Sequence, residues 1–411
     1  MNGETAYLSA LGMTCAAGDG VAAVLANLRR GTAPGMVSTD RWTPGLSLTV
    51  GEARDADGGA SWTSGLPAFP AGHRTRNNGL ALHASRQIEA ELRAATAAFG
   101  AGRVGVVVGT TTSGMAEAEA AFQAARDRGS LPDAFAYAQM ELGSPAEFLA
   151  LAWGLKGPAY TVSTACSSSA KALASARRLL RLGVCDAVLA GGVDTLCAFT
   201  LRGFSALGAL SPYPCLPFSP NRAGINIGEA AAFFVMRRDR GPVALLGAGE
   251  TSDAHNVSAP LPGGEGARDA MAAALRNAGV EPYQVGYVNL HGTGTPQNDA
   301  MEARAMRAVF PGGAACSSTK PLTGHTLGAA GALEAGICWA LLREAAAGAG
   351  AGEPEREGWL PPQFSDGRED PELGLQGLVR PGGRPAGPLR YALSNAFGFG
   401  GTNVSLLLGV P

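Results

Sequence analysis

Short apolar runs alternate with longer segments rich in Ala, Leu and Arg along most of the chain, and this alternation restricts the chain to an α/β fold. The short runs are apolar throughout, which indicates strands buried on both faces of a sheet. Strands are predicted at residues 6–11, 104–109, 159–163, 187–191, 232–237, 243–248, 286–290, 389–394 and 404–408. Helices are predicted at residues 21–30, 117–128, 167–182, 267–278, 299–310 and 326–342.

A chain of 411 residues, 46% hydrophobic and 16% charged, has material for two domains or one large layered unit and is not disordered. Its net charge of −2 argues against a nucleic-acid or polybasic membrane surface. No apolar run reaches the ~20 residues that span a bilayer. The 7 cysteines form no CxxC pair, and the first residues lack the pattern of a secretory signal. We therefore expect a cytoplasmic protein with reduced thiols.

Two predicted strand-to-helix junctions carry chemically capable side chains, Cys166 after the segment 161–165 and His325 after the segment 317–324. A duplicated fold with its active site between the halves would produce this repetition. At the first junction, backbone N–H groups and the helix dipole can stabilise a thiolate, so we predict that Cys166 is a nucleophile. The alternative is that small residues there only allow close packing. We assign the other cysteines to the core.

Two of the 5 histidines lie in unusual local sequences. His291 follows a predicted strand, at the carboxyl end where α/β folds gather their ligand sites. His325 lies where a helix is predicted to begin. Metal ligation is a competing use, but neither histidine belongs to an HxxxH or CxxC arrangement, so we expect no metal. Together with Cys166, the two histidines are interpreted as one catalytic constellation.

Glu334 lies in an otherwise apolar run, where an unpaired carboxylate would be costly. Lys320 is the only lysine in the C-terminal half and is its natural ionic partner. On a helix, Glu334 and His325 would lie on opposite faces, so Glu334 should not orient His325 directly. The alternative is a partly exposed carboxylate on a helix surface.

Two further patterns, a glycine-rich segment and a pair of acidic residues, predict local structure. The glycine-rich segment 395–403 is followed by a predicted strand rather than a helix, so it does not fit a phosphate-binding loop. We interpret it as a tight turn that brings backbone N–H groups to an active site, for example as an oxyanion hole. Asp299 and Glu302 fit a capping box at the start of their helix.

Taken together, four segments resemble the beta-ketoacyl-ACP synthases, the condensing enzymes of the thiolase superfamily. They are Thr-Ala-Cys-Ser-Ser-Ser at 164–169, His-Gly-Thr-Gly-Thr-Pro at 291–296, residues 320–331 and residues 397–403, in the family's order and approximate spacing. The resemblance covers essentially the whole chain. It implies a five-layered αβαβα sandwich of two pseudo-symmetric βαβαβαββ halves, with the nucleophile in residues 1–242 and both histidines in residues 243–411.

The resemblance implies a decarboxylative Claisen condensation by a Cys-His-His triad. Cys166 would take an acyl group from acyl carrier protein as a thioester. His291 and His325 would then donate hydrogen bonds to the thioester carbonyl of malonyl-ACP while it loses carbon dioxide, and the resulting carbanion would attack the acyl-cysteine. No cofactor or metal is implied beyond the 4′-phosphopantetheine arm of the carrier.

The same resemblance implies supporting roles for residues around the triad. These are the ion pair of Lys320 and Glu334, the oxyanion-hole N–H groups of Cys166 and Phe399, the pantetheine contacts Thr293 and Thr295, the acyl-pocket gate Phe399, and the substrate contacts Phe397, Phe204 and Thr112, the last in the stretch 110–114.

Some segments depart from the family pattern. Residues 221–231 replace the usual Arg-Asp-Gly-Phe and Gly-Asp-Gly-Ala stretch, whereas residues 7–12, 74–78 and 298–302 are more similar to synthases of aryl-polyene clusters. That subgroup implies an unsaturated aryl primer and a homodimer or a heterodimer with a chain-length-factor-like partner. Because lysines are scarce among the 32 basic residues, a docking patch for an acidic carrier would be built from arginines.

Three other functions fit parts of the pattern. A non-catalytic chain-length-factor-like subunit typically lacks the cysteine. A thiolase-type acyltransferase would carry a second cysteine near the C-terminus, where this chain has Phe397-Gly398-Phe399. A cysteine hydrolase would leave Lys320 and one histidine unexplained. The leading interpretation is a beta-ketoacyl-ACP synthase of fatty-acid-like or polyene biosynthesis.

Overall fold

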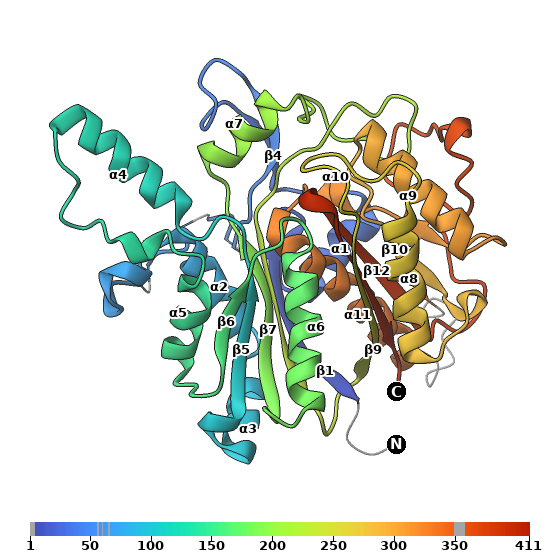
Figure 1. Ribbon diagram of the computed structural model, residues 1–411, viewed down its shortest axis with the longest axis horizontal. Coiled ribbons are helices and arrows are strands. Elements are labelled where there is room, and N and C mark those ends of the chain that lie inside the picture. Colours follow the sequence, from blue (N-terminus) through green and yellow to red (C-terminus); the bar gives the residue numbers. More distant parts are fainter. Residues whose placement is uncertain (1–4, 56, 60, 65, 349–357) are drawn as a thin grey trace.

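The computed structural model describes residues 5–348 and 358–411, except residues 56, 60 and 65 (Figure 1). Its main sheet has 11 strands, in two groups of five that meet where β1 pairs with β9, plus the short β2 beside β1. The strands are β1 (Ala6–Cys15), β2 (Gly18–Asp19), β5 (Val104–Gly109), β6 (Ala159–Val162), β7 (Ala187–Asp194), β8 (Ala230–Arg237), β9 (Val243–Ser252), β10 (Tyr287–Asn289), β11 (Cys316–Ser317), β12 (Tyr391–Gly398) and β13 (Thr402–Gly409), with β3 (Met36–Thr39) and β4 (Leu48–Gly51) in a separate pair.

The two groups of strands repeat one topology. The first runs β6-β5-β7-β8-β1 and the second β11-β10-β12-β13-β9, so that both have the order 3-2-4-5-1 when their strands are numbered along the chain. In each group the second strand is parallel to its two neighbours, and the fifth is antiparallel to both of its neighbours. The fold is therefore a duplication, as the paired strand-to-helix junctions predicted.

Helices complete five layers around the strands (Figure 1). α6 and α11 pack against each other in the middle layer, α2 and α5 cover the outer face of the first group of strands, and α8, with α9 beside it, covers the second. The helices are α1 (Val21–Arg30), α2 (Arg76–Arg86), α3 (Glu89–Phe99), α4 (Met115–Arg128), α5 (Ser144–Trp153), α6 (Ser168–Arg181), α7 (Ala198–Ala206), α8 (Glu265–Ala278), α9 (Pro296–Val309), α10 (Lys320–Thr323) and α11 (Ala330–Gly348). This is the thiolase-like αβαβα sandwich.

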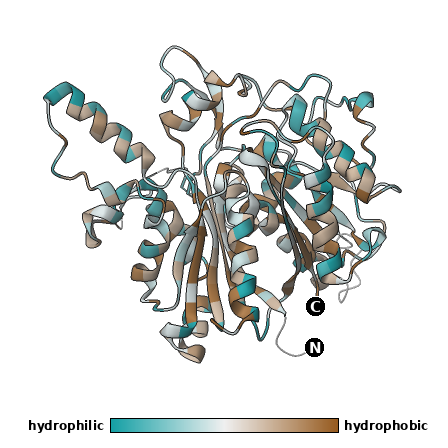
Figure 2. Ribbon diagram, viewed as in Figure 1, coloured by the Kyte–Doolittle hydropathy of each residue, from teal (hydrophilic) through white to brown (hydrophobic). Residues whose placement is uncertain are grey.

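Burial explains why the strands are apolar throughout. Every residue of β5, β7 and β8 is buried, and Figure 2 shows the central strands as the most apolar part of the ribbon. Because helices cover both faces of the strands, a polar residue would have no solvent on either side. Within the described chain, no helix is long and apolar enough to cross a membrane.

The predicted elements match the structure best where the local pattern is strong. α1 and β5 have the predicted bounds, and every other predicted strand is present with shifted ends. α2, α3, α5, α7 and the short α10 were not predicted. α2 has Asn77, Asn78 and Gly79 in its first turns, which are weak helix formers, and its packing on β1 and β8 outweighs their propensity.

The middle layer depends on a close crossing of α6 and α11. A Cβ atom at Gly331, near the start of α11, would lie 2.6 Å from the Cβ of Ala170 and 2.7 Å from its backbone nitrogen. No L side chain fits at this distance without movement of one helix. Gly331 therefore sets how closely the two central helices approach.

We expect Gly331→Ala to destabilise the protein by about 1–3 kcal/mol, because the added methyl group overpacks a buried backbone contact. Gly203→Ala is a matched control, because Gly203 lies in α7 and a Cβ there would meet nothing within 4 Å. Its exposed helical position should gain up to about 1 kcal/mol from the better helix former. Denaturant unfolding of both variants measures the difference, and equal effects would contradict the close crossing.

Candidate active site

Cys166 occupies a strained turn between β6 and α6. The preceding residue, Ala165, has a φ of 53°, which non-glycine residues adopt rarely. Ser168 holds the turn, since its Oγ accepts from the N–H of Thr164 (2.9 Å) and donates to the carbonyl of Ala165 (2.6 Å). The thiol is 5% exposed and faces a cavity. The structure thus places the predicted nucleophile on the kind of turn that the sequence indicated.

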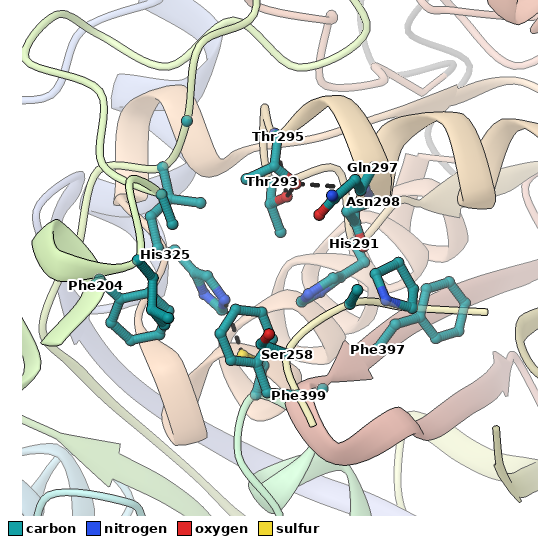
Figure 3. Close-up of a pocket in the computed structure, with 18 of the residues that line it drawn as sticks. Phe204, Ser258, His291, Thr293, Thr295, Gln297, Asn298, His325, Phe397 and Phe399 are labelled. Carbon is teal, nitrogen blue, oxygen red and sulfur yellow. Dashed lines mark hydrogen bonds between the residues drawn. The ribbon is translucent and has the colours of Figure 1, made fainter. Parts of the chain in front are cut away.

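His325 lies against this thiol, with its Nε2 3.0 Å from the Sγ of Cys166, the contact dashed in Figure 3. Its backbone is clamped by the segment 226–228: the N–H of His325 donates to the carbonyl of Asn226 (2.7 Å), and its carbonyl accepts from Gly228 (2.9 Å). A Cβ at Gly228 would lie 2.5 Å from the carbonyl oxygen of Thr323. The stretch that departs from the family pattern therefore supports the histidine.

His291 follows β10 and reaches the same point from the other side (Figure 3). The two imidazole rings are nearly perpendicular, with centroids 5.3 Å apart. The carboxylate of Glu302 accepts from the N–H groups of His291 and Gly292, both at 2.7 Å. A buried carboxylate on α9 thus orients the loop that carries His291.

This arrangement corrects the predicted capping box. α9 begins at Pro296, and its N-cap is Thr295, whose side chain accepts from Asn298. Asp299 accepts instead from the N–H groups of Phe218 (2.9 Å) and Gly294 (3.2 Å). The prediction failed because tertiary contacts, rather than the helix's own N–H groups, use the two carboxylates.

Lys320 and Glu334 form a buried ion pair behind the histidines, with side chains 1% and 2% exposed. The ammonium group also donates to the carbonyl of His291 and lies 3.5 Å from its Nδ1. With Nδ1 facing a cation that only donates, a neutral His291 carries its proton on Nε2. Lys320 therefore sets both the place and the tautomer of this ring.

Burial keeps the three reacting groups uncharged. It raises the pKa of the Cys166 thiol from 9.0 to about 11, opposed by Lys320 and the N–H groups of Phe399 and Cys166. Burial, and then the charge of Lys320, holds the pKa of His291 and of His325 well below the usual value of 6.5. The N–H groups at this junction do lower the pKa of the thiol, as expected from the sequence, but desolvation outweighs them.

The donor atoms of Cys166, His291 and His325 all lie within 4.8 Å of one another, a set that could also hold a soft metal ion. The ammonium of Lys320 beside His291 would repel such a cation. The charge environment therefore favours a nucleophile with two hydrogen-bond donors.

The triad opens into a cavity of about 400 Å³. Thr293 and Thr295 lie on its wall with their hydroxyls 3.0 Å apart, and Phe204 stacks on Phe399 with ring centroids 5.4 Å apart (Figure 3). Phe397 also lines the cavity. So do Ser258, Gln297 and Asn298, to which the sequence assigned no role in the site.

The glycine-rich turn brings β12 close to Cys166. A Cβ at Gly398 would lie 3.0 Å from the carbonyl of Thr164 and 3.2 Å from the backbone nitrogen of Cys166. Glycine here lets the N–H of Phe399 approach the sulfur, where it lowers the pKa of the thiol. The N–H groups of Cys166 and Phe399 thus converge on the sulfur of Cys166.

Thr112 does not line this cavity. It is 2% exposed, and its hydroxyl donates to the carboxylate of Asp194 (2.9 Å). The structure therefore places it in a buried polar network and gives no support to its expected contact with substrate. Asp194, Asn226 and Glu302 hydrogen-bond to the segments that carry the two histidines. These contacts were missed because the sequence carries no local signal of long-range partners.

Residues 9–240 match the family described as Beta-ketoacyl synthase, N-terminal domain, and residues 243–348 match its C-terminal domain. Nodulation protein E of Rhizobium meliloti is 34% identical over 316 residues, covering 74% of this chain and 75% of that protein. The 3-oxoacyl-(acyl-carrier-protein) synthase 2 of Synechocystis sp. is 32% identical over 375 residues, covering 87% and 86%.

Among solved structures, the ketosynthase ApeO, solved with its chain length factor ApeC from Xenorhabdus doucetiae, has a TM-score of 0.89 and 43% identity, over 99% of this chain and 98% of that one. A beta-ketoacyl synthase from Burkholderia phymatum has a TM-score of 0.86 and 27% identity over 99% and 100%. With the duplicated fold and the Cys-His-His site, these matches show that the chain belongs to the beta-ketoacyl synthase family.

Proposed function

We propose that this beta-ketoacyl-ACP synthase carries its acyl chain on Cys166 and uses His291 and His325 to decarboxylate malonyl-ACP. The observation that carries the proposal is the 3.0 Å contact of the Cys166 sulfur with His325 at the floor of a cavity that His291 also lines. All three groups are buried, and burial favours their uncharged forms.

In the acyl transfer, the sulfur of Cys166 attacks the thioester carbonyl of acyl-ACP. His325 takes the thiol proton on Nε2 and returns it to the departing pantetheine sulfur, so that no proton is released overall. The Nδ1 of His325 has no hydrogen-bond partner among the described residues, so no neighbour locks its tautomer. The ring can therefore accept a proton in this step and donate one in the next.

In the condensation, the malonyl carboxylate leaves as carbon dioxide and its bonding electrons form an enolate. The enolate oxygen accepts hydrogen bonds from Nε2 of His291 and of His325. The enolate carbon attacks the acyl thioester of Cys166, whose oxyanion accepts from the N–H groups of Cys166 and Phe399. The tetrahedral intermediate then expels the cysteine sulfur, which takes up one proton from solvent through His325 to become a thiol again, and the elongated product stays on the carrier.

The lining of the cavity supports the proposed substrate contacts. Thr293 and Thr295 would bind the amides of the pantetheine arm, and Phe204, Phe397 and Phe399 would offer apolar surface to the acyl chain. The carrier's pantetheine arm supplies the only cofactor in this scheme. We also propose that the protein acts in the cytoplasm, where carrier-bound substrates are made.

We further propose that the chain extends an unsaturated aryl primer in polyene biosynthesis, paired with a chain-length-factor-like subunit. The 43% identity with a ketosynthase solved with its chain length factor supports this subgroup. The surface also fits a subunit contact: β6 ends one edge of the main sheet, and the projecting α4 exposes Phe122, with Tyr137 exposed in the segment that follows (Figure 1).

Cys166→Ala should abolish both the acyl-enzyme and the elongated product, because no other thiol lines the cavity. Intact-mass measurement after incubation with acyl-ACP, followed by labelled malonyl-ACP with and without the partner subunit, checks both steps. Cys185→Ala, at a buried thiol beside the start of β7, is the control and should keep both. An acyl-enzyme formed by Cys166→Ala, or no carbon dioxide from the wild type with its partner, would refute the proposal.

Iodoacetamide should alkylate Cys166 at a rate that keeps rising from pH 7 to pH 10, because the thiolate is the reacting form and its pKa is about 11. Since Lys320 lowers this pKa, the double variant Lys320→Met/Glu334→Gln should be alkylated more slowly from pH 7 to pH 10, by roughly threefold for each unit of pKa, because the more basic thiolate is also the more nucleophilic one. Changing both partners leaves no lone buried charge.

The exposed Lys156→Met serves as the control for this pair and should leave the pH profile unchanged. Peptide mass analysis of the alkylated Cys166 separates it from the other thiols. A plateau near pH 8 in the wild type, or faster alkylation of the double variant, would contradict the assigned charge environment.

A further inference from the structure

Asp194, the last residue of β7, is a completely buried carboxylate that the mechanism above does not use. Uncharged groups donate all six of its hydrogen bonds in the described structure. They are the hydroxyls of Thr110 (2.6 Å), Thr111 (2.5 Å) and Thr112 (2.9 Å) and the N–H groups of Thr111 (2.7 Å), Thr112 (2.9 Å) and Gly328 (2.6 Å). A buried carboxylate with this many donors is held in one orientation.

These donors come from both halves of the fold. The threonines follow β5 in the first half, whereas Gly328 lies three residues after His325 in the second. A Cβ at Gly328 would lie 2.8 Å from the Oδ2 of Asp194, so only glycine allows this contact. Asp194 is thus a direct link from the ends of β5 and β7 to the turn that follows the histidine.

The turn that follows His325 is strained and depends on contacts with its surroundings. Leu327 has a φ of 50°, in the left-handed region that a leucine rarely adopts, and the short 3-10 turn Leu327–Ala329 separates His325 from α11. Strain of this kind persists only where the surroundings hold it. The N–H of Gly328 belongs to this turn, and Asp194 is its acceptor.

We propose that Asp194 is a positioning residue: by binding the N–H of Gly328, it holds the turn that keeps His325 against the nucleophile. The threonine run from Thr110 to Thr112 orients the carboxylate for this contact. The stretch in which the resemblance implied a substrate contact at Thr112 therefore acts on the histidine instead. The inference rests on the proposed catalytic role of His325.

The negative charge of Asp194 affects the reactivity of Cys166, and this reactivity would not change if Asp194 had a merely structural role. The charge raises the pKa of Cys166, in opposition to Lys320. Replacing Asp194 by Asn should therefore lower this pKa and speed alkylation of the thiol, while the misplaced histidine slows the condensation. The two rates should change in opposite directions.

For Asp194→Asn we expect condensation with acyl-ACP and malonyl-ACP to fall about 10- to 100-fold, the scale of a catalytic group displaced by about 1 Å. Alkylation of Cys166 at pH 8 should become several-fold faster. Asp186→Asn is the matched control, because Asp186 immediately precedes β7 and pairs with Arg103 and Arg238 at the end of the strand away from Asp194. It should change neither rate.

Thr111→Val is the second variant, since its hydroxyl donates to the oxygen that also accepts from Gly328. It keeps side-chain shape and charge, and it should slow condensation several-fold at an unchanged melting temperature. This variant decides the matter if Asp194→Asn does not fold.

Condensation by Asp194→Asn within twofold of the wild type would overturn the proposal. The proposal would also be overturned if condensation and alkylation by Asp194→Asn both fell and its melting temperature fell with them. If Asp194→Asn does not fold, condensation by Thr111→Val at the wild-type rate would overturn it. Failure of the proposed function shows differently, because the wild type itself would then release no carbon dioxide. The alkylation rates report the link between Asp194 and Cys166 in either case.

Discussion

The buried ion pair of Lys320 and Glu334 is the interaction on which the site depends. Both side chains are almost fully buried, and pairs of this kind often contribute little net stability because desolvation opposes their attraction. The position of the ion pair explains its role in the site better than its contribution to stability does. The pair joins α10 to α11, and the ammonium group also binds the carbonyl of His291. One cation thus lies behind all three reacting groups, where it lowers the pKa of each.

Duplication explains how two distant sequence segments meet at this point. In each half the third strand leads toward the central layer, β6 to α6 and β11 to α11, and these two helices cross where Gly331 meets Ala170. Cys166 ends the first connection and His325 lies in the second. The repeated topology therefore brings the nucleophile and its neighbour together across the pseudo-symmetry, and the small residues of the crossing set how closely they approach.

Features with a local sequence signal could be predicted, and those that depend on long-range polar contacts could not. Buried strands such as β5 appear as apolar runs, and the motifs around Cys166, His291 and His325 pointed to the residues that the fold gathers. Glu302 shows the limit: its spacing from Asp299 suggested a helix cap, yet both carboxylates bind the loop after β10 and its neighbours. Thr112 was predicted to contact substrate because the sequence shows its position in the chain but not its hydrogen bonds.

The raised pKa of Cys166 affects its reactivity in two opposite ways. Raising the pKa of Cys166 from 9.0 to about 11 lowers the thiolate population roughly 100-fold, but the more basic thiolate is intrinsically about tenfold more nucleophilic. The net deficit of about tenfold is smaller than the roughly 100-fold that a positioned general base contributes. His325, 3.0 Å from the sulfur and itself neutral, can supply that base. The same burial leaves both imidazoles uncharged, and a neutral imidazole with its proton on Nε2 can donate to an enolate oxygen. Burial therefore slows acyl transfer slightly and prepares the imidazoles for the decarboxylation that follows. The position of His325 decides whether the net effect on the reaction is favourable.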